Sequence, residues 1–109
     1  DGDGIKDLVT GKRFWAHGPS GDAEPNAAAV LYWFKLVRGA DKSVDFIPYL
    51  VDDNSGIGTQ VVAGDMNGDG TVDIVSVNLP ANGSARTSLF VNNGNASFQP
   101  RTPLFDSGI

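Results

Sequence analysis

Oxygen-bearing residues alternate along one short stretch of the chain, GDMNGDGTVDIVSVN (residues 64–78). The candidate ligands are Asp65, Asn67, Asp69, Thr71 through its carbonyl, and Asp73. Calcium takes about six to eight hard oxygen ligands in flexible geometry, and a tight turn directs every second side chain inward. Gly70 follows the third ligand and permits a sharp bend that a Cβ would obstruct. The stretch therefore predicts a calcium (Ca2+) loop at residues 65–73.

The kind of loop follows from what comes after it. An EF-hand loop needs a bidentate Glu at its twelfth position and a helix behind it. The twelfth position here is Ser76, which lies in the β-rich run DIVSVN. A dockerin loop also needs a following helix, which VSVNLPANG does not supply. The loop is therefore expected to precede a strand, with Asp73 opening that strand.

A second loop of similar sequence opens the chain. DGDGIKDLVT (1–10) matches NGDGTVDIVS (67–76) at a shift of 66 residues. The matching candidate ligands are Asp1, Asp3, Ile5 through its carbonyl, and Asp7, while the leading Asp would precede residue 1. One Asp/Asn/Gly cluster could simply form a tight turn. Two clusters in the same register, each followed by a β-rich strand, favour metal loops.

Other parts of the chain also recur. VDFIPYLVDDNSGIG (44–58) resembles ASFQPRTPLFDSGI (96–109), while residues 12–29 have no counterpart of similar length. The sequence therefore predicts two units, a first at 1–64 with an insertion at 12–29 and an incomplete second at 65–109.

The segments that position these loops read as strands. Apolar and β-branched runs separated by turn clusters predict strands near 7–11, 30–37, 44–50, 59–64, 73–78, 86–92 and 97–104. No segment has a convincing helical period with caps, although NAAAVLYWFKLV begins like one. The expected fold class is all-β. Short strands in groups of four that repeat are typical of propeller blades.

These residues resemble the repeat of a known family. VAGDMNGDGTVDIVSVN followed by LFVNNGNASF resembles the FG-GAP/VCBS repeat of integrin-α-like β-propellers, whose pattern is D-x-[DN]-x-D-G-x-x-D before a strand. The resemblance covers nearly the whole chain apart from residues 12–29. It implies four-stranded antiparallel blades, calcium held in the loops between strands, and neighbouring blades in a longer chain. About two blades are present, and a ring needs about four to eight.

Composition excludes several function classes. The net charge is −5, from 13 acidic and 8 basic residues without a Lys/Arg cluster, so nucleic acid is not an expected partner. The chain has no cysteine, which excludes zinc–thiolate sites, a thiol nucleophile and disulfides. No apolar run approaches the roughly 20 residues needed to cross a bilayer, so no membrane insertion is expected. The expected location is extracellular or at the cell surface, or alternatively periplasmic.

Catalytic groups are sparse in this sequence. His17 is the one histidine, and neither G-x-S-x-G nor a phosphate loop occurs. The expectation is therefore a binding or adhesion scaffold for a protein or glycan ligand, not an enzyme. The alternatives are a carbohydrate-binding module and a non-catalytic appendage of a secreted enzyme. Aromatic residues that could stack on sugars or pack between blades are Phe14, Trp15, Tyr32 and Trp33.

The strands also predict exposed apolar faces. A blade needs a neighbour on each face, so two blades alone would associate, aggregate or occur only in a longer chain. The face residues expected from the sequence are Val30, Tyr32, Phe34, Val61, Val75 and Phe90.

Overall fold

The computed structural model describes residues 1–55, 60–78, 86–95 and 97–106, and within these ranges the regular structure is entirely β. The strands are β1 (Leu8–Lys12), β2 (Val30–Arg38), β3 (Val44–Asp52), β4 (Gln60–Gly64), β5 (Asp73–Asn78), β6 (Arg86–Phe90) and β7 (Thr102–Asp106). The all-β prediction is confirmed. The last strand, expected over 97–104, begins only at Thr102. A single bridge joins Asn92 to Phe98, and Pro100 then has no N–H to continue the ladder.

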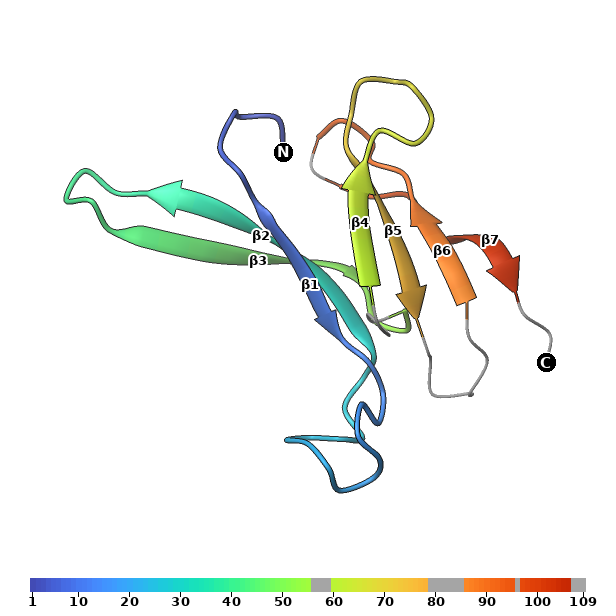
Figure 1. Ribbon diagram of the computed structural model, residues 1–109. Coiled ribbons are helices and arrows are strands. Elements are labelled where there is room, and N and C mark those ends of the chain that lie inside the picture. The colour runs from blue at the N-terminus through green and yellow to red at the C-terminus, as the bar shows by residue number, and fades with distance from the viewer. Residues whose placement is uncertain (56–59, 79–85, 96, 107–109) are drawn as a thin grey trace.

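The strands form two antiparallel sheets, one in the order β1-β2-β3 and one in the order β4-β5-β6-β7 (Figure 1). Gly64 pairs with Asp73, so residues 65–72 form the hairpin connection between β4 and β5. The boundary between sheets therefore lies between β3 and β4, whereas the sequence units were divided between residues 64 and 65. Because the second sequence unit was taken to begin at the acidic loop, β4 falls in the first unit, although it belongs to the four-stranded sheet.

The two sheets share a register. In the three-stranded sheet Leu8 pairs with Phe34, and in the four-stranded sheet Ile74 pairs with Phe90. Because Leu8 and Ile74 both follow an aspartate at the end of an acidic loop, β1 corresponds to β5 and β2 corresponds to β6. Phe34 is thus the structural counterpart of Phe90.

A small apolar core joins the sheets. Leu31, Ile74 and Phe90 are buried together. Partly buried apolar side chains surround them, from Val9, Val51, Val61 and Phe98. In β2 the buried side chains are Leu31 and Trp33. The sequence predicted the other side of this strand as the blade face, and the residues on that side are only half-buried. The four-stranded sheet packs on the odd-numbered side of β2, a choice that an almost wholly apolar strand does not reveal.

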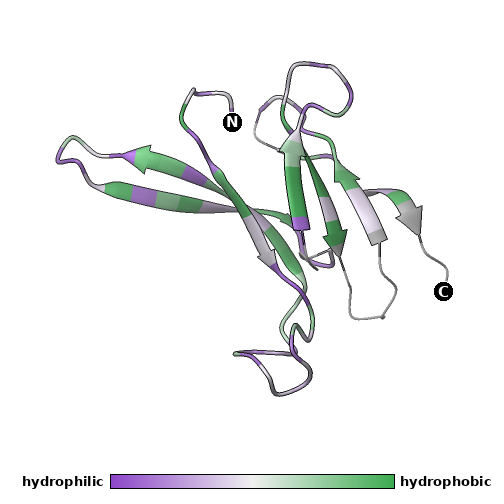
Figure 2. Ribbon diagram, viewed as in Figure 1, coloured by the Kyte–Doolittle hydropathy of each residue, from purple (hydrophilic) through white to green (hydrophobic). Residues whose placement is uncertain are grey.

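The two sheets contact each other through faces that do not correspond. Phe90 is fully buried against the three-stranded sheet, yet its counterpart Phe34 points away from the shared core and is only half-buried. Cross-strand pairs place Leu8, Phe46 and Leu50 on the same outer side as Phe34, and these three are 50%, 48% and 54% exposed. Figure 2 shows that apolar residues run along much of β2 and β3 beyond the four-stranded sheet. One broad apolar face is therefore uncovered within this chain.

Candidate metal centre

The loop at residues 65–73 is held by its own acidic side chains. The Asp65 carboxylate accepts hydrogen bonds from the backbone nitrogens of Gly68 at 2.7 Å and Gly70 at 2.9 Å. Asp69 Oδ1 accepts from the Thr71 nitrogen at 2.8 Å and from its hydroxyl at 2.6 Å. Gly70 has a φ of 87°, in the left-handed region that favours glycine, as its position in the sequence motif predicts. The loop is therefore a series of tight side-chain-to-backbone turns.

Asp73 closes this loop from within the sheet. Its side chain is completely buried; Oδ2 accepts from the Met66 nitrogen and Oδ1 from the Asn92 nitrogen, each at 2.9 Å. A buried carboxylate is stable only when its oxygens are satisfied, and here backbone N–H groups of the loop and of the segment after β6 satisfy them. The charged residue that opens β5 thus has its partners in these N–H groups.

Asn92 is a structural residue that the sequence analysis missed. Its side-chain nitrogen donates to the Val72 carbonyl at 3.1 Å, and its side-chain oxygen accepts from the Gly94 nitrogen at 2.9 Å. The Asn92 carbonyl also accepts from the Thr71 hydroxyl at 3.3 Å. The residue therefore ties the β6–β7 connection to the acidic loop. The only sequence signal was the turn cluster NNGN, which does not indicate a partner 20 residues away.

Negative charge accumulates in this loop without a matching cation. Asp65, Asp69 and Asp73 supply three carboxyl groups, and none of the ion pairs found among the described residues involves them. The Thr71 hydroxyl holds the pKa of Asp69 below its usual value, and the Thr71 N–H and the Asn67 amide act in the same direction. The loop is therefore anionic at neutral pH.

The donor atoms of this loop fit calcium. Oxygen donors that each retain a lone pair come from Asp65, Asn67, Asp69 and the Thr71 carbonyl, and hard oxygen ligands are those that calcium prefers. Within the described ranges, no three His, Cys, Asp or Glu side chains are already gathered around one point. The carboxylates instead turn toward loop N–H groups, so calcium would have to draw them inward. Buried Asp73 would then hold the ends of the loop together.

The N-terminal loop repeats the same turns. The Asp3 nitrogen donates to Asp1 Oδ1 at 3.1 Å, and the Ile5 nitrogen donates to Asp3 Oδ1 at 2.8 Å. The equivalent bonds 66 residues later, from the nitrogens of Asp69 and Thr71, have the same lengths of 3.1 and 2.8 Å. Asp7 Oδ1 accepts from the Leu36 nitrogen at 3.1 Å, as Asp73 accepts from Asn92. The two loops therefore share one backbone design.

A lysine distinguishes the N-terminal loop. The Lys35 ammonium forms ion pairs with Asp1 and, at 3.3 Å, with Asp3. The pKa of Asp3 lies below its usual value, chiefly because its carboxylate accepts the Ile5 N–H and also because Lys35 lies beside it. Neither predicted ligand set gathers three acidic side chains around one point in the described residues, and the N-terminal set has Lys35 beside Asp1 and Asp3 and the N-terminal ammonium 2.8 Å from Asp7.

The loops lie at the same end of the molecule (Figure 1) and border one hollow of about 660 Å³. Its floor is apolar and comes from both sheets, through Val9, Trp33 and Ile74. Asp1 and Asp7 line it from one loop, and Val72 and Asn92 line it from the other side.

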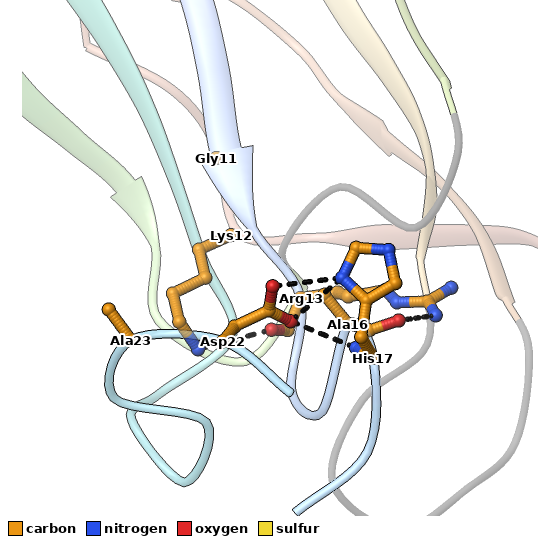
Figure 3. A pocket seen from close by; sticks show the side chains of 7 residues that line it. All are labelled: Gly11, Lys12, Arg13, Ala16, His17, Asp22 and Ala23. Atoms are coloured by element: carbon orange, nitrogen blue, oxygen red, sulfur yellow. Dashed lines mark hydrogen bonds and ion pairs between the residues drawn. The ribbon is translucent and has the colours of Figure 1, made fainter. Parts of the chain in front are cut away.

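The insertion forms a separate hollow of about 560 Å³ at the opposite end, lined by Lys12, Arg13, His17 and Asp22 among others (Figure 3). His17 Nδ1 lies 2.8 Å from Asp22 Oδ1, and this contact lowers the pKa of Asp22. The histidine side chain is 78% exposed. The described residues that line this hollow include no Ser, Thr or Cys.

The two tryptophans have different environments. Trp33 is buried and stacks on Tyr49, its partner on the neighbouring strand of the same sheet, with ring centroids 4.5 Å apart. Trp15 is 44% exposed, stacks on Phe14 at 5.2 Å and donates from Nε1 to Asn26 at 2.7 Å. Within this chain Trp15 does not pack between the two sheets, because it lies in the insertion, away from the shared core.

No family model, curated protein or solved structure matches the chain. No helix in the described residues is long and apolar enough to cross a membrane.

Proposed function

We propose that the chain is a calcium-binding β-propeller segment of the FG-GAP/VCBS type that serves as an extracellular scaffold for a protein or glycan ligand, without catalysis. The observation that carries the calcium proposal is the loop at 65–73. Its oxygen donors have the alternating spacing of a calcium loop, and its three carboxylates form no ion pair in the described part of the chain. Weak oxygen-only loops suit the high calcium concentrations outside cells.

The stacking of the sheets supports the propeller proposal. The two sheets contact each other through non-equivalent faces. A further sheet could therefore cover the outer face of the three-stranded sheet, which carries Leu8, Phe46 and Leu50, by the same kind of contact. A contact between two different faces repeats head to tail, and it closes into a ring when the rotation allows. Neighbouring blades of a longer chain are the partners that this geometry suits.

Calorimetry with calcium tests the metal proposal. The chain should bind calcium with measurable heat, and chelator should lower its melting temperature. Asp69→Ala should abolish both effects, because it removes a central oxygen donor and the acceptor for Thr71. Asp53→Ala, a change of an exposed carboxylate between β3 and β4, is the matched control and should leave both unchanged. A wild-type melting temperature indifferent to chelator would reject the proposal.

Light scattering tests the uncovered face. The isolated chain should associate as its concentration rises, because a large apolar face is rarely left in water by a monomeric protein. Replacing Phe46 and Leu50 with lysine should shift the protein toward monomer, while Lys42→Glu in the adjacent β2–β3 turn should not. A monomeric wild-type chain that melts cooperatively would count against the propeller arrangement.

Carbohydrate binding is the second candidate, and the exposed Phe14–Trp15 stack favours it. An exposed indole face can stack on a sugar ring, and Trp15 is held in place by its bond to Asn26. A glycan array with wild type and Trp15→Ala decides this: loss of a specific glycan signal supports it, and no signal from either protein rejects it.

A further inference from the structure

Lys35 stands in an unusual position for a lysine. It lies in β2 on the same side as Leu31 and Trp33, which are buried in the core, and its own side chain is one-third exposed. At this end of the strand its ammonium group meets the N-terminal acidic loop and forms ion pairs with Asp1 and Asp3. A charged group on the core-facing side of an apolar strand needs such partners.

The other unit has no equivalent charge. Leu8–Phe34 and Ile74–Phe90 are corresponding pairs, so Lys35 corresponds to Val91, the residue after Phe90. The backbone nitrogen of the residue after Lys35 donates to Asp7, and that of the residue after Val91 donates to Asp73, which gives the same alignment. The cation therefore belongs to one loop only.

We propose that the Lys35 ammonium takes the place of a metal ion in the N-terminal loop, so that this chain binds one calcium ion, at residues 65–73. The ammonium contacts Asp1 and Asp3, which correspond to the candidate ligands Asn67 and Asp69. A calcium ion on the same carboxylates would have to displace the lysine or lie against its positive charge, and both oppose binding. The comparison rests on the proposed function, since the second loop is the reference calcium site.

Calcium stoichiometry in four chains tests the proposal. Isothermal titration with calcium chloride, after chelator treatment, would compare wild type, Lys35→Met, Asp69→Ala and the double variant, each with an acetylated N-terminus so that no terminal ammonium contacts Asp7. Methionine keeps most of the side-chain stem and removes the charge. The expected numbers of calcium ions are about one, two, none and one respectively, because losing the lysine frees the first loop and losing Asp69 disables the second.

The outcomes separate this proposal from the proposed function. One ion in wild type and still one in Lys35→Met overturns the lysine proposal and leaves the second loop as the calcium site. No ion in wild type but one in Lys35→Met supports the lysine proposal and rejects the proposed function. Two ions in wild type overturn the lysine proposal, and none in any of the four chains overturns both.

Two further variants guard against loss of folding. Lys35→Arg keeps the positive charge and should retain one ion, which separates the effect of charge from that of disturbing β2. Asp3→Asn in the wild-type background should also retain one ion under the proposal. If the N-terminal loop were itself a calcium site, Asp3→Asn would remove an ion. Circular dichroism of each variant checks that the sheets remain.

Discussion

The two acidic loops have the same backbone and different cations. In both, side-chain oxygens accept N–H groups two residues ahead, and a terminal aspartate accepts an N–H from the neighbouring strand or its continuation. The N-terminal loop has Lys35 against Asp1 and Asp3 and the N-terminal ammonium against Asp7, and the loop at 65–73 has no ion pair in the described residues. The same series of turns therefore occurs beside a lysine in one loop and without an ion pair in the other. Under our proposal, the residue that the adjacent strand supplies decides which cation each loop holds.

The largest expected difference between the loops concerns their terminal aspartates. Asp73→Ala should lower the free energy of unfolding by about 2–6 kcal/mol, because two N–H groups lose their acceptor and each unsatisfied buried group costs about 1–3 kcal/mol. Asp7→Ala should cost less, about 1–3 kcal/mol, since the Asp7 side chain retains 13% exposure and water can replace it. Urea unfolding of both variants measures the difference. Equal losses of unfolding free energy in the two variants would show that the deeper burial of Asp73 does not make it the larger contributor to stability.

Calcium should stabilise the chain through one loop. A ligand at 100 times its dissociation constant adds about 2.7 kcal/mol to the stability of a protein that binds it only when folded. Wild type and Asp3→Asn should both gain this much, and Asp69→Ala should gain nothing. Thermal unfolding with and without calcium measures the gain. An equal loss of the calcium effect in Asp3→Asn and Asp69→Ala would remove the distinction between the loops.

Removing the lysine should have a smaller effect when calcium is absent. Lys35→Met removes the side-chain ammonium beside Asp1 and Asp3, and partly exposed ion pairs contribute about 0–1 kcal/mol. The variant should therefore lose up to about 1 kcal/mol in chelator, and calcium should restore the loss. The same change at the corresponding position, Val91→Met, should produce no calcium-dependent difference from wild type.

The smallest expected effect is on the acid side of the stability curve. The pKa values of Asp3 and Asp69 are lowered in the folded protein, so each carboxylate adds stability above its unfolded pKa of about 3.9 and loses it as the pH falls through the folded value. In chelator, Asp3→Asn and Asp69→Asn should each flatten the decline in stability below about pH 4. Urea midpoints between about pH 2.5 and 6 measure this decline. An unchanged slope in both variants would contradict the assignment of those carboxylates.

Much of the fold follows from the sequence, because turn clusters and β-branched runs define local structure. Residues 73–78 form β5 as predicted, and the other predicted strands up to residue 90 are found within a few residues. The pairing of β4 with β5 is a local hairpin within one sheet, whereas the buried side of β2 depends on contacts between the sheets. In VLYWFKLV both sides of the strand are apolar, so alternation could not identify the side carrying Leu31 and Trp33.

The candidate site was predicted less completely. The alternating oxygen donors and Gly70 are local features, so spacing alone gives their turns. Lys35 lies 34 residues from Asp1 and meets it only through the register of β1 with β2. One signal was available: a lone lysine in an apolar strand needs a partner, by the same reasoning that applied to Asp73.

Residue-resolved NMR during a calcium titration tests the central claim most directly. Amide resonances of residues 65–73 should shift and saturate with calcium, together with that of Asn92, whose nitrogen donates to Asp73. Those of residues 1–7 should stay nearly unchanged in wild type and should respond in Lys35→Met. Matching saturable shifts of both loops in wild type, or none in either loop, would contradict the account.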